Sequence, residues 1–155
     1  MPHNLHVVLI EPEIPSNTGS IGRACLATGT TLHLVDPLGF EITDARLKRA
    51  GLDYWQHLKI ERHPGVKQFF ASIPHDAPKV FFSKKAENIY FEHDFEQGSY
   101  LIFGKETAGL SDDLLEKYSN SVYRIPQYDE RVRSLNLSNA VTLGIYEAIR
   151  QLGPK

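Results

Sequence analysis

The first apolar run of the chain, Leu5-His6-Val7-Val8-Leu9-Ile10, is nearly continuous and does not alternate with polar residues. The run Tyr100-Leu101-Ile102-Phe103 has the same character. Continuous runs of this kind are typical of parallel strands covered on both faces, whereas a half-exposed strand alternates. Both runs therefore predict central strands of a parallel sheet.

Further apolar runs and two helical patterns lie around these two strands. We expect additional strands at Thr31–Val35, Lys79–Phe82 and Ser121–Ile125. Asn17 is a candidate cap for a helix that ends near Thr28, with Gly29 as its stop. A second helix is expected before Gly153, because the apolar residues near the end of the chain recur at helical spacing: Val141, Ile145, Ala148, Ile149 and Leu152. Alternating strands and helices indicate an α/β fold.

The composition indicates one domain that spans residues 1–155. Hydrophobic residues make up 41% of the chain and charged residues 23%, and no apolar run is long enough to cross a membrane. The first residues lack the pattern of a secretory signal, so we expect a cytoplasmic protein. Because the formal net charge is −2, an anionic partner would have to bind a local basic patch.

Several common chemistries lack their residue patterns in this sequence. Cys25 is the only cysteine and lies in a helical pattern, which favours a buried apolar role. The seven histidines form no H-x-x-x-H pair, so we expect no metal site. Glu106 stands where a phosphate-binding loop needs Ser or Thr after its lysine, and no G-x-G-x-x-G follows the first strand.

Polar and glycine-rich segments follow three of the expected strands: residues 11–19, 104–109 and 126–139. In open α/β sheets, ligands bind outside the carboxyl ends of the strands. We therefore expect these three loops to share one site.

These loops resemble the three ordered motifs of the SPOUT RNA methyltransferases. The matching residues are Asn17-Thr18-Gly19 with Arg23, then Phe103–Leu110, then Ile125-Pro126 followed by Ser134–Ala140. The chain is further similar, nearly end to end, to the minimal members that methylate the 2′-hydroxyl of the wobble nucleotide, cytidine or uridine 34, of tRNA. Two departures are Lys105 and Ala108, where many relatives carry Pro and Arg.

The resemblance implies a homodimer with a C-terminal trefoil knot that holds S-adenosylmethionine. The positions expected to hold this cofactor are Phe82, Gly104, Gly109, Ile125, Ser134, Leu135 and Leu137. The resemblance also implies an activity on the anticodon loop, with tRNA-Leu isoacceptors as substrates. Two alternatives stay open, namely methylation of another RNA nucleotide and a non-catalytic RNA-binding dimer.

Arg23 and Asn17 are the catalytic candidates that the resemblance implies. Because an arginine side chain with a pKa above about 12 is a poor base, we expect Arg23 to orient the substrate. Asn17 stands at the start of the same expected helix, so both residues are expected to face one cleft. Glu106 is expected to support the loop backbone. Candidate RNA contacts are Lys84, Arg131, Arg133 and Tyr146, from two basic clusters and an aromatic residue that could stack a base.

Overall fold

A computed structural model describes residues 3–43, 45, 49 and 52–153 of the chain. Its seven strands form one sheet in the order β3-β2-β1-β6-β4-β7-β5, and every pairing between neighbours is parallel. The strands are β1 (His6–Ile10), β2 (Thr31–Val35), β3 (Ile60–His63), β4 (Lys79–Phe82), β5 (Asn88–Ile89), β6 (Tyr100–Phe103) and β7 (Val122–Arg124). The predicted parallel α/β sheet is confirmed.

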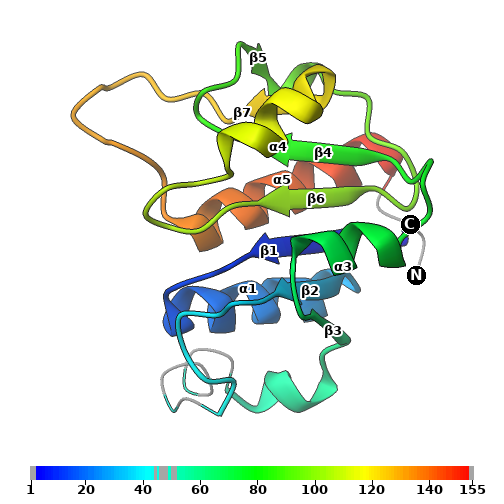
Figure 1. Cartoon of the computed structure of the whole chain (residues 1–155), viewed down its shortest axis with the longest axis vertical. Helices are drawn as coiled ribbons and strands as arrows, with labels where there is room; N and C mark the ends of the chain where they lie inside the picture. The colour runs from blue at the N-terminus through cyan, green and yellow to red at the C-terminus, as the bar shows by residue number, and fades with distance from the viewer. Residues whose placement is uncertain (1–2, 44, 46–48, 50–51, 154–155) are drawn as a thin grey trace.

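Helices cover both faces of the sheet (Figure 1). The helices are α1 (Pro15–Thr28), α3 (Val66–Ser72), α4 (Asp112–Lys117) and α5 (Leu137–Leu152), with short 3-10 segments at Leu52–His57, Tyr90–Glu92 and Ser119–Ser121. One apolar cluster joins α1 and α5 to one face, and a second joins α3 and α4 to the other. None of the described helices is long and apolar enough to cross a membrane.

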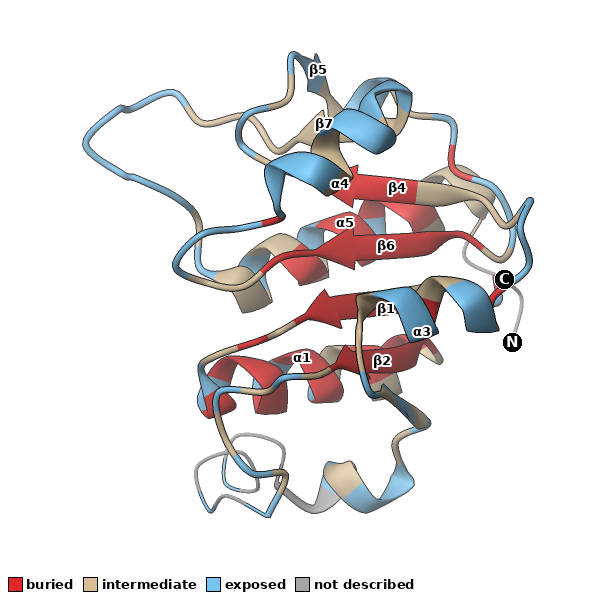
Figure 2. Cartoon of the chain, in the orientation of Figure 1, coloured by how far each residue is buried: buried red, intermediate tan, exposed pale blue. Residues whose placement is uncertain are grey.

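Burial explains why the central strands were predictable from sequence. All residues of β2 and β6 are buried, as are four of the five in β1 (Figure 2). By contrast, β3 has the sequence Ile-Glu-Arg-His at the sheet edge and carries no continuous apolar signal. No sequence pattern predicted β3, the two-residue β5, or the short helices α3 and α4.

The helix ends refine two sequence expectations. Gly29 ends α1 with a left-handed φ of 69°, as predicted. The start of α1 differs, because the helix begins at Pro15 and Asn17 lies inside its first turn. Pro is common at this first position, where the missing N–H is not needed. Asn17 is therefore not a cap, and its side chain is available for tertiary contacts.

The order of the strands places a crevice at the centre of the sheet. The chain proceeds outward from β1 to β2 and β3 on one side, while β6 and β4 lie on the other side of β1. This reversal between β1 and β6 is the position at which open α/β sheets bind ligands. The loops after β1, β6 and β7 all emerge at the carboxyl ends of the strands (Figure 1).

Candidate active site

A cavity of about 350 Å³ lies at the carboxyl ends of the central strands. Its walls come from the loops that follow β1, β4, β6 and β7, and from the first turn of α5. This volume lies within the range of small-molecule sites. The three loops that were expected to share one site line one cavity, and the segment after β4 adds a fourth wall.

Two carboxylates hold the loop after β1 against the loop after β6. Glu106 accepts hydrogen bonds from the backbone N–H of Glu13 at 2.8 Å and of Ile14 at 3.0 Å. In return, Glu13 accepts from the backbone N–H of Thr107 at 2.9 Å and from its hydroxyl at 2.8 Å. These bonds from Thr107 hold the pKa of Glu13 below its usual value. Glu106 thus supports the loop after β1, as a structural carboxylate.

An amide pair connects the third loop to the other two. Asn17 donates from Nδ2 to Glu106 at 3.2 Å and accepts from Nδ2 of Asn136 at 3.1 Å. The side-chain oxygen of Asn136 caps α5 by accepting from the backbone N–H of Ser138 at 2.9 Å. The hydrogen bonds that link Glu106, Asn17 and Asn136 therefore fix the relative positions of the loops after β1, β6 and β7.

Two glycines shape the loop after β6 for different reasons. A Cβ on Gly104 would stand 2.1 Å from the backbone carbon of Gly109 and 2.3 Å from the nitrogen of Leu110. Gly109 instead has a left-handed φ of 70°, and its N–H donates to the carbonyl of Lys105 at 2.8 Å. Gly104 is therefore required by the close approach of the backbone, and Gly109 by its conformation.

All seven positions expected to hold a cofactor line this cavity: Phe82, Gly104, Gly109, Ile125, Ser134, Leu135 and Leu137. The ring of Phe82 stacks on Phe103 with centroids 4.5 Å apart, which anchors one apolar wall in the core. Residues 104–110 line the same cavity as the apolar residues Phe82, Ile125 and Leu137. A wall of this kind suits a ligand that combines a flat ring with polar groups.

The basic candidates differ in their surroundings. Lys84 lines the cavity and donates to the carbonyl of Arg133 at 3.4 Å. Lys84 and Arg133 also border a neighbouring hollow that Arg124 lines as well. Arg131 lines neither hollow, and its guanidinium binds Asp129 at 2.6 Å while remaining 91% exposed. Among the described basic residues that line either hollow, Lys84, Arg124 and Arg133 form no ion pair with another described side chain.

Arg23 and Asn17 do not face one cleft within the chain. Asn17 lines the cavity, whereas Arg23 is exposed on α1 and its guanidinium lies 5.2 Å from the ring centre of Tyr54. Six positions along a helix turn a side chain by about 120° from its starting direction, which separates the two residues. The predicted shared cleft is therefore wrong for a single chain. Tyr146, half-exposed on α5, also lies outside the cavity.

The structure adds contacts that the sequence analysis missed. Lys105 forms an ion pair with Glu11 at 3.0 Å, which adds a further tie between the loops after β1 and β6. Glu13 and Thr107 are 94 residues apart, so no local pattern could have paired them. A second omission is a group of side chains on β2 and β3, where His33, Glu61 and His63 lie close enough to hold a metal ion.

Comparison with known proteins places these features in a family. The model of the SpoU rRNA methylase family matches residues 4–146. Two relatives named tRNA (cytidine(34)-2′-O)-methyltransferase are 43% identical over 150 residues, in Burkholderia cenocepacia, and 45% identical over 151 residues, in Saccharophagus degradans. In both comparisons the match covers 96% of this chain and 96% of the relative.

Solved structures show the same fold. A protein studied for the 2-OH methylation of C/U34 on tRNA superimposes with a TM-score of 0.93 and 43% identity, over 98% of each chain. An AdoMet-bound rRNA methyltransferase from Sinorhizobium meliloti superimposes with a TM-score of 0.86 and 25% identity, over 99% of this chain and 59% of that one. The fold, the cavity formed by its loops and the match along nearly the whole sequence agree, and the chain belongs to the SpoU methylase family.

Proposed function

We propose that the chain transfers the methyl group of S-adenosylmethionine to the 2′-hydroxyl of nucleotide 34 of tRNA. The observation that carries this proposal is the single cavity in which all seven expected cofactor positions meet. The relatives that match over nearly their whole length are named for this reaction, and a family structure contains AdoMet. We also propose that the reaction takes place in the cytoplasm.

The residues present fit this methyl donor. A Cβ on Gly104 would collide with the backbone of residues 109 and 110, so this loop can fold back tightly on itself where it lines the cavity. Leu135 and Leu137 offer apolar surface for an adenine ring, and backbone groups of residues 104–110 offer polar contacts. S-adenosylmethionine supplies an already activated methyl group.

The protein's task in this reaction is to position the two reactants. The oxygen of the ribose forms a bond to the methyl carbon as the sulfur–methyl bond breaks, and the hydroxyl proton leaves to solvent. Asn17 has both ends of its amide engaged by Glu106 and Asn136, so it acts as a positioning residue that holds the cavity's loops. Lys84 and Arg133 are placed to bind RNA phosphates beside the cavity.

Arg23 acts, in this proposal, on the cavity of a second copy of the chain. This assignment is supported by its exposed position outside its own cavity. Leu143 and Tyr146 are exposed apolar side chains on α5, which packs beside α1, and they favour a dimer that buries them. We also propose the family's trefoil knot, which is supported by the contact that the segment before α5 makes with α1 through Asn136 and Asn17.

The test is incubation of the protein with methyl-labelled donor and bulk tRNA that lacks its own modifications, followed by digestion to nucleosides. We expect label in 2′-O-methylcytidine or 2′-O-methyluridine, and in tRNA-Leu isoacceptors before others. Label in a different nucleoside would favour an enzyme for another RNA position. Donor binding without any transfer would favour a non-catalytic RNA-binding dimer.

A further inference from the structure

Three histidines lie side by side on neighbouring strands, away from the cavity. His6 on β1 contacts His33 on β2 through ring nitrogens 2.9 Å apart, and His33 contacts His63 on β3 through ring nitrogens 3.0 Å apart. Glu61, two residues before His63, brings a carboxylate oxygen to 3.2 Å from Nδ1 of His33. None of these residues lines the cavity described above.

The parallel register explains this convergence. Glu61 is the pairing partner of His33, and His63 follows two positions later on the same face of β3. Side chains directly opposite each other, and those on the diagonal, are neighbours on one face of a sheet. His33 lies 28 positions before Glu61 and 30 before His63, so no short spacing in the sequence reveals the group.

Nδ1 of His33 has more partners than one ring nitrogen can serve. Both Nε2 of His63 and the carboxylate of Glu61 point at it. A ring nitrogen carries either one proton or one lone pair, so hydrogen bonding can satisfy only one of these contacts well. A cation at the centre would instead use a lone pair from all three atoms.

We propose that Nδ1 of His33, Nε2 of His63 and the carboxylate of Glu61 bind a zinc ion. Two imidazoles and a carboxylate form a ligand set that zinc favours. Zinc lies about 2.0–2.1 Å from such ligands, which places tetrahedral ligand atoms about 3.3 Å apart. The separations of 3.0 and 3.2 Å are close to this value, and all three ligand atoms lie within 4.8 Å of one another.

The surroundings also suit a metal centre. With metal on Nδ1, the opposite Nε2–H of His33 is placed to donate to His6, whose ring stacks on Tyr100 with centroids 4.0 Å apart. A partner on the second ring nitrogen is the usual support of a metal-binding histidine.

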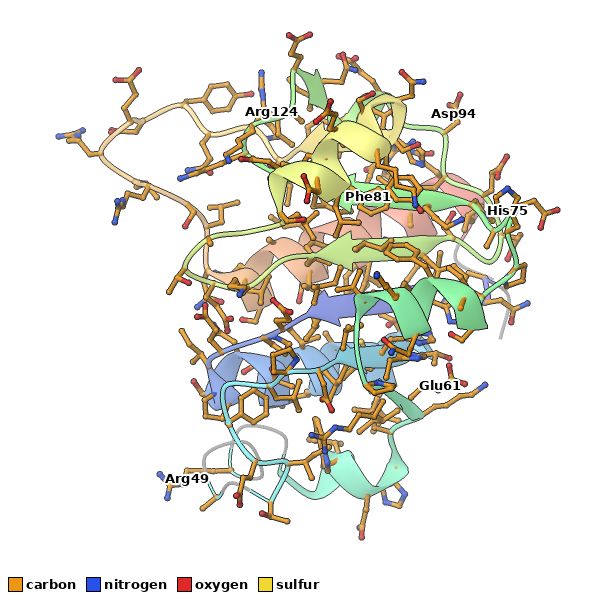
Figure 3. All side chains as sticks on the ribbon, in the orientation of Figure 1. Arg49, Glu61, His75, Phe81, Asp94 and Arg124 are labelled. Atoms are coloured by element: carbon orange, nitrogen blue, oxygen red, sulfur yellow. The ribbon has the colours of Figure 1, made fainter. Side chains whose placement is uncertain are left out.

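Access and charge are compatible with loading from solvent. The side chain of Glu61, labelled in Figure 3 on β3, is 52% exposed, while His33 is 1% exposed. Glu61 supplies negative charge to balance Lys59, the nearby cation that also acts on His33. Because β3 is an edge strand with a pairing partner on one side only, the zinc would clip it to β2. The role is structural and separate from methyl transfer.

The experiment is a titration of untagged, chelator-treated protein with zinc by calorimetry, and with Co²⁺ followed by its visible absorption. We expect one ion per chain, a tetrahedral cobalt spectrum and no heat from Mg²⁺, which prefers oxygen ligands. His63→Gln and Glu61→Gln should each weaken binding at least tenfold. Both residues lie on the partly exposed edge strand, so these variants leave the buried His33 in place.

His75→Gln is the matched control, because His75 is an exposed histidine outside the group (Figure 3). Its zinc affinity should equal that of the unaltered chain, and zinc should raise the unfolding temperature of both proteins but not of His63→Gln. Equal zinc binding by His63→Gln and the unaltered chain, or no binding by either, would overturn the proposal. The histidines would then form a neutral hydrogen-bonded row only.

Discussion

Replacing Gly104 by alanine tests how the cavity is built. The added Cβ would approach the backbone carbon of Gly109 to 2.1 Å, whereas ordinary contacts of a Cβ lie at 3.4–4 Å. The loop of residues 105–110 must therefore move by more than 1 Å, and the atoms in its way are backbone atoms that cannot rotate aside. Overpacking of this kind costs about 1–3 kcal/mol.

The displacement of this loop should also weaken the binding of S-adenosylmethionine. Residues 104–110 form one wall of the cavity, so binding must restore the loop to its present position. If the full strain opposes binding, the dissociation constant for S-adenosylmethionine rises roughly 5- to 150-fold. The clash is with the loop itself, so alanine should suffice and a bulky residue is not needed to block the ligand.

Calorimetry with S-adenosylmethionine measures this effect, and Gly98→Ala is its control. Gly98, unlike Gly104, has a left-handed φ of 77°, and a Cβ there would meet nothing within 4 Å. This control should lose stability of about 1–2 kcal/mol through backbone strain while it keeps its donor affinity, because Gly98 lies outside the cavity. Normal affinity in Gly104→Ala would refute the proposed role of the loop.

Three more outcomes are expected. Arg23→Ala should reduce turnover on the order of 10²-fold with little change in donor affinity. Arg23→Lys should restore little activity, because the ammonium of lysine cannot reproduce the planar, two-pronged guanidinium of arginine. Single-turnover assays with saturating tRNA measure this effect, and a nearly unchanged rate in Arg23→Ala would contradict the role of Arg23. Asn136→Ala should cost about 1 kcal/mol in urea unfolding through the lost cap of α5, and should also weaken donor binding through the lost tie to Asn17. EDTA should leave the methyl-transfer rate unchanged at temperatures well below unfolding, because the zinc proposed at His33 lies outside the cavity. A loss of methyl transfer that only a divalent ion restores would contradict the metal-free mechanism.

The central strands and the position of the site could be predicted because both follow from burial and topology. The runs at 31–35, 79–82 and 100–103 match β2, β4 and β6 to the residue. In a parallel sheet the carboxyl ends of strands meet at one edge, so polar loops after them converge. The edge strand β3 gave no such signal, since it is only partly covered and carries charged residues.

The details of the site could not be predicted, because they depend on loop conformation and helix phase. The pairing of Glu106 with Glu13 and Ile14 joins residues more than 90 positions apart. The placement of Arg23 and Asn17 on different sides of α1 depends on where the helix begins and how it packs. Likewise, His33 and Glu61 become neighbours only through the register of β2 and β3.

The most direct test of the proposed function uses two versions of one tRNA-Leu that differ only by the presence of the 2′-hydroxyl at nucleotide 34. With labelled S-adenosylmethionine, we expect transfer of about one methyl group to the natural tRNA and none to the 2′-deoxy version, since the accepting oxygen is absent. The 2′-deoxy tRNA should still compete for binding, which shows that it is recognised. Equal methylation of both molecules would contradict nucleotide 34 as the site of the reaction.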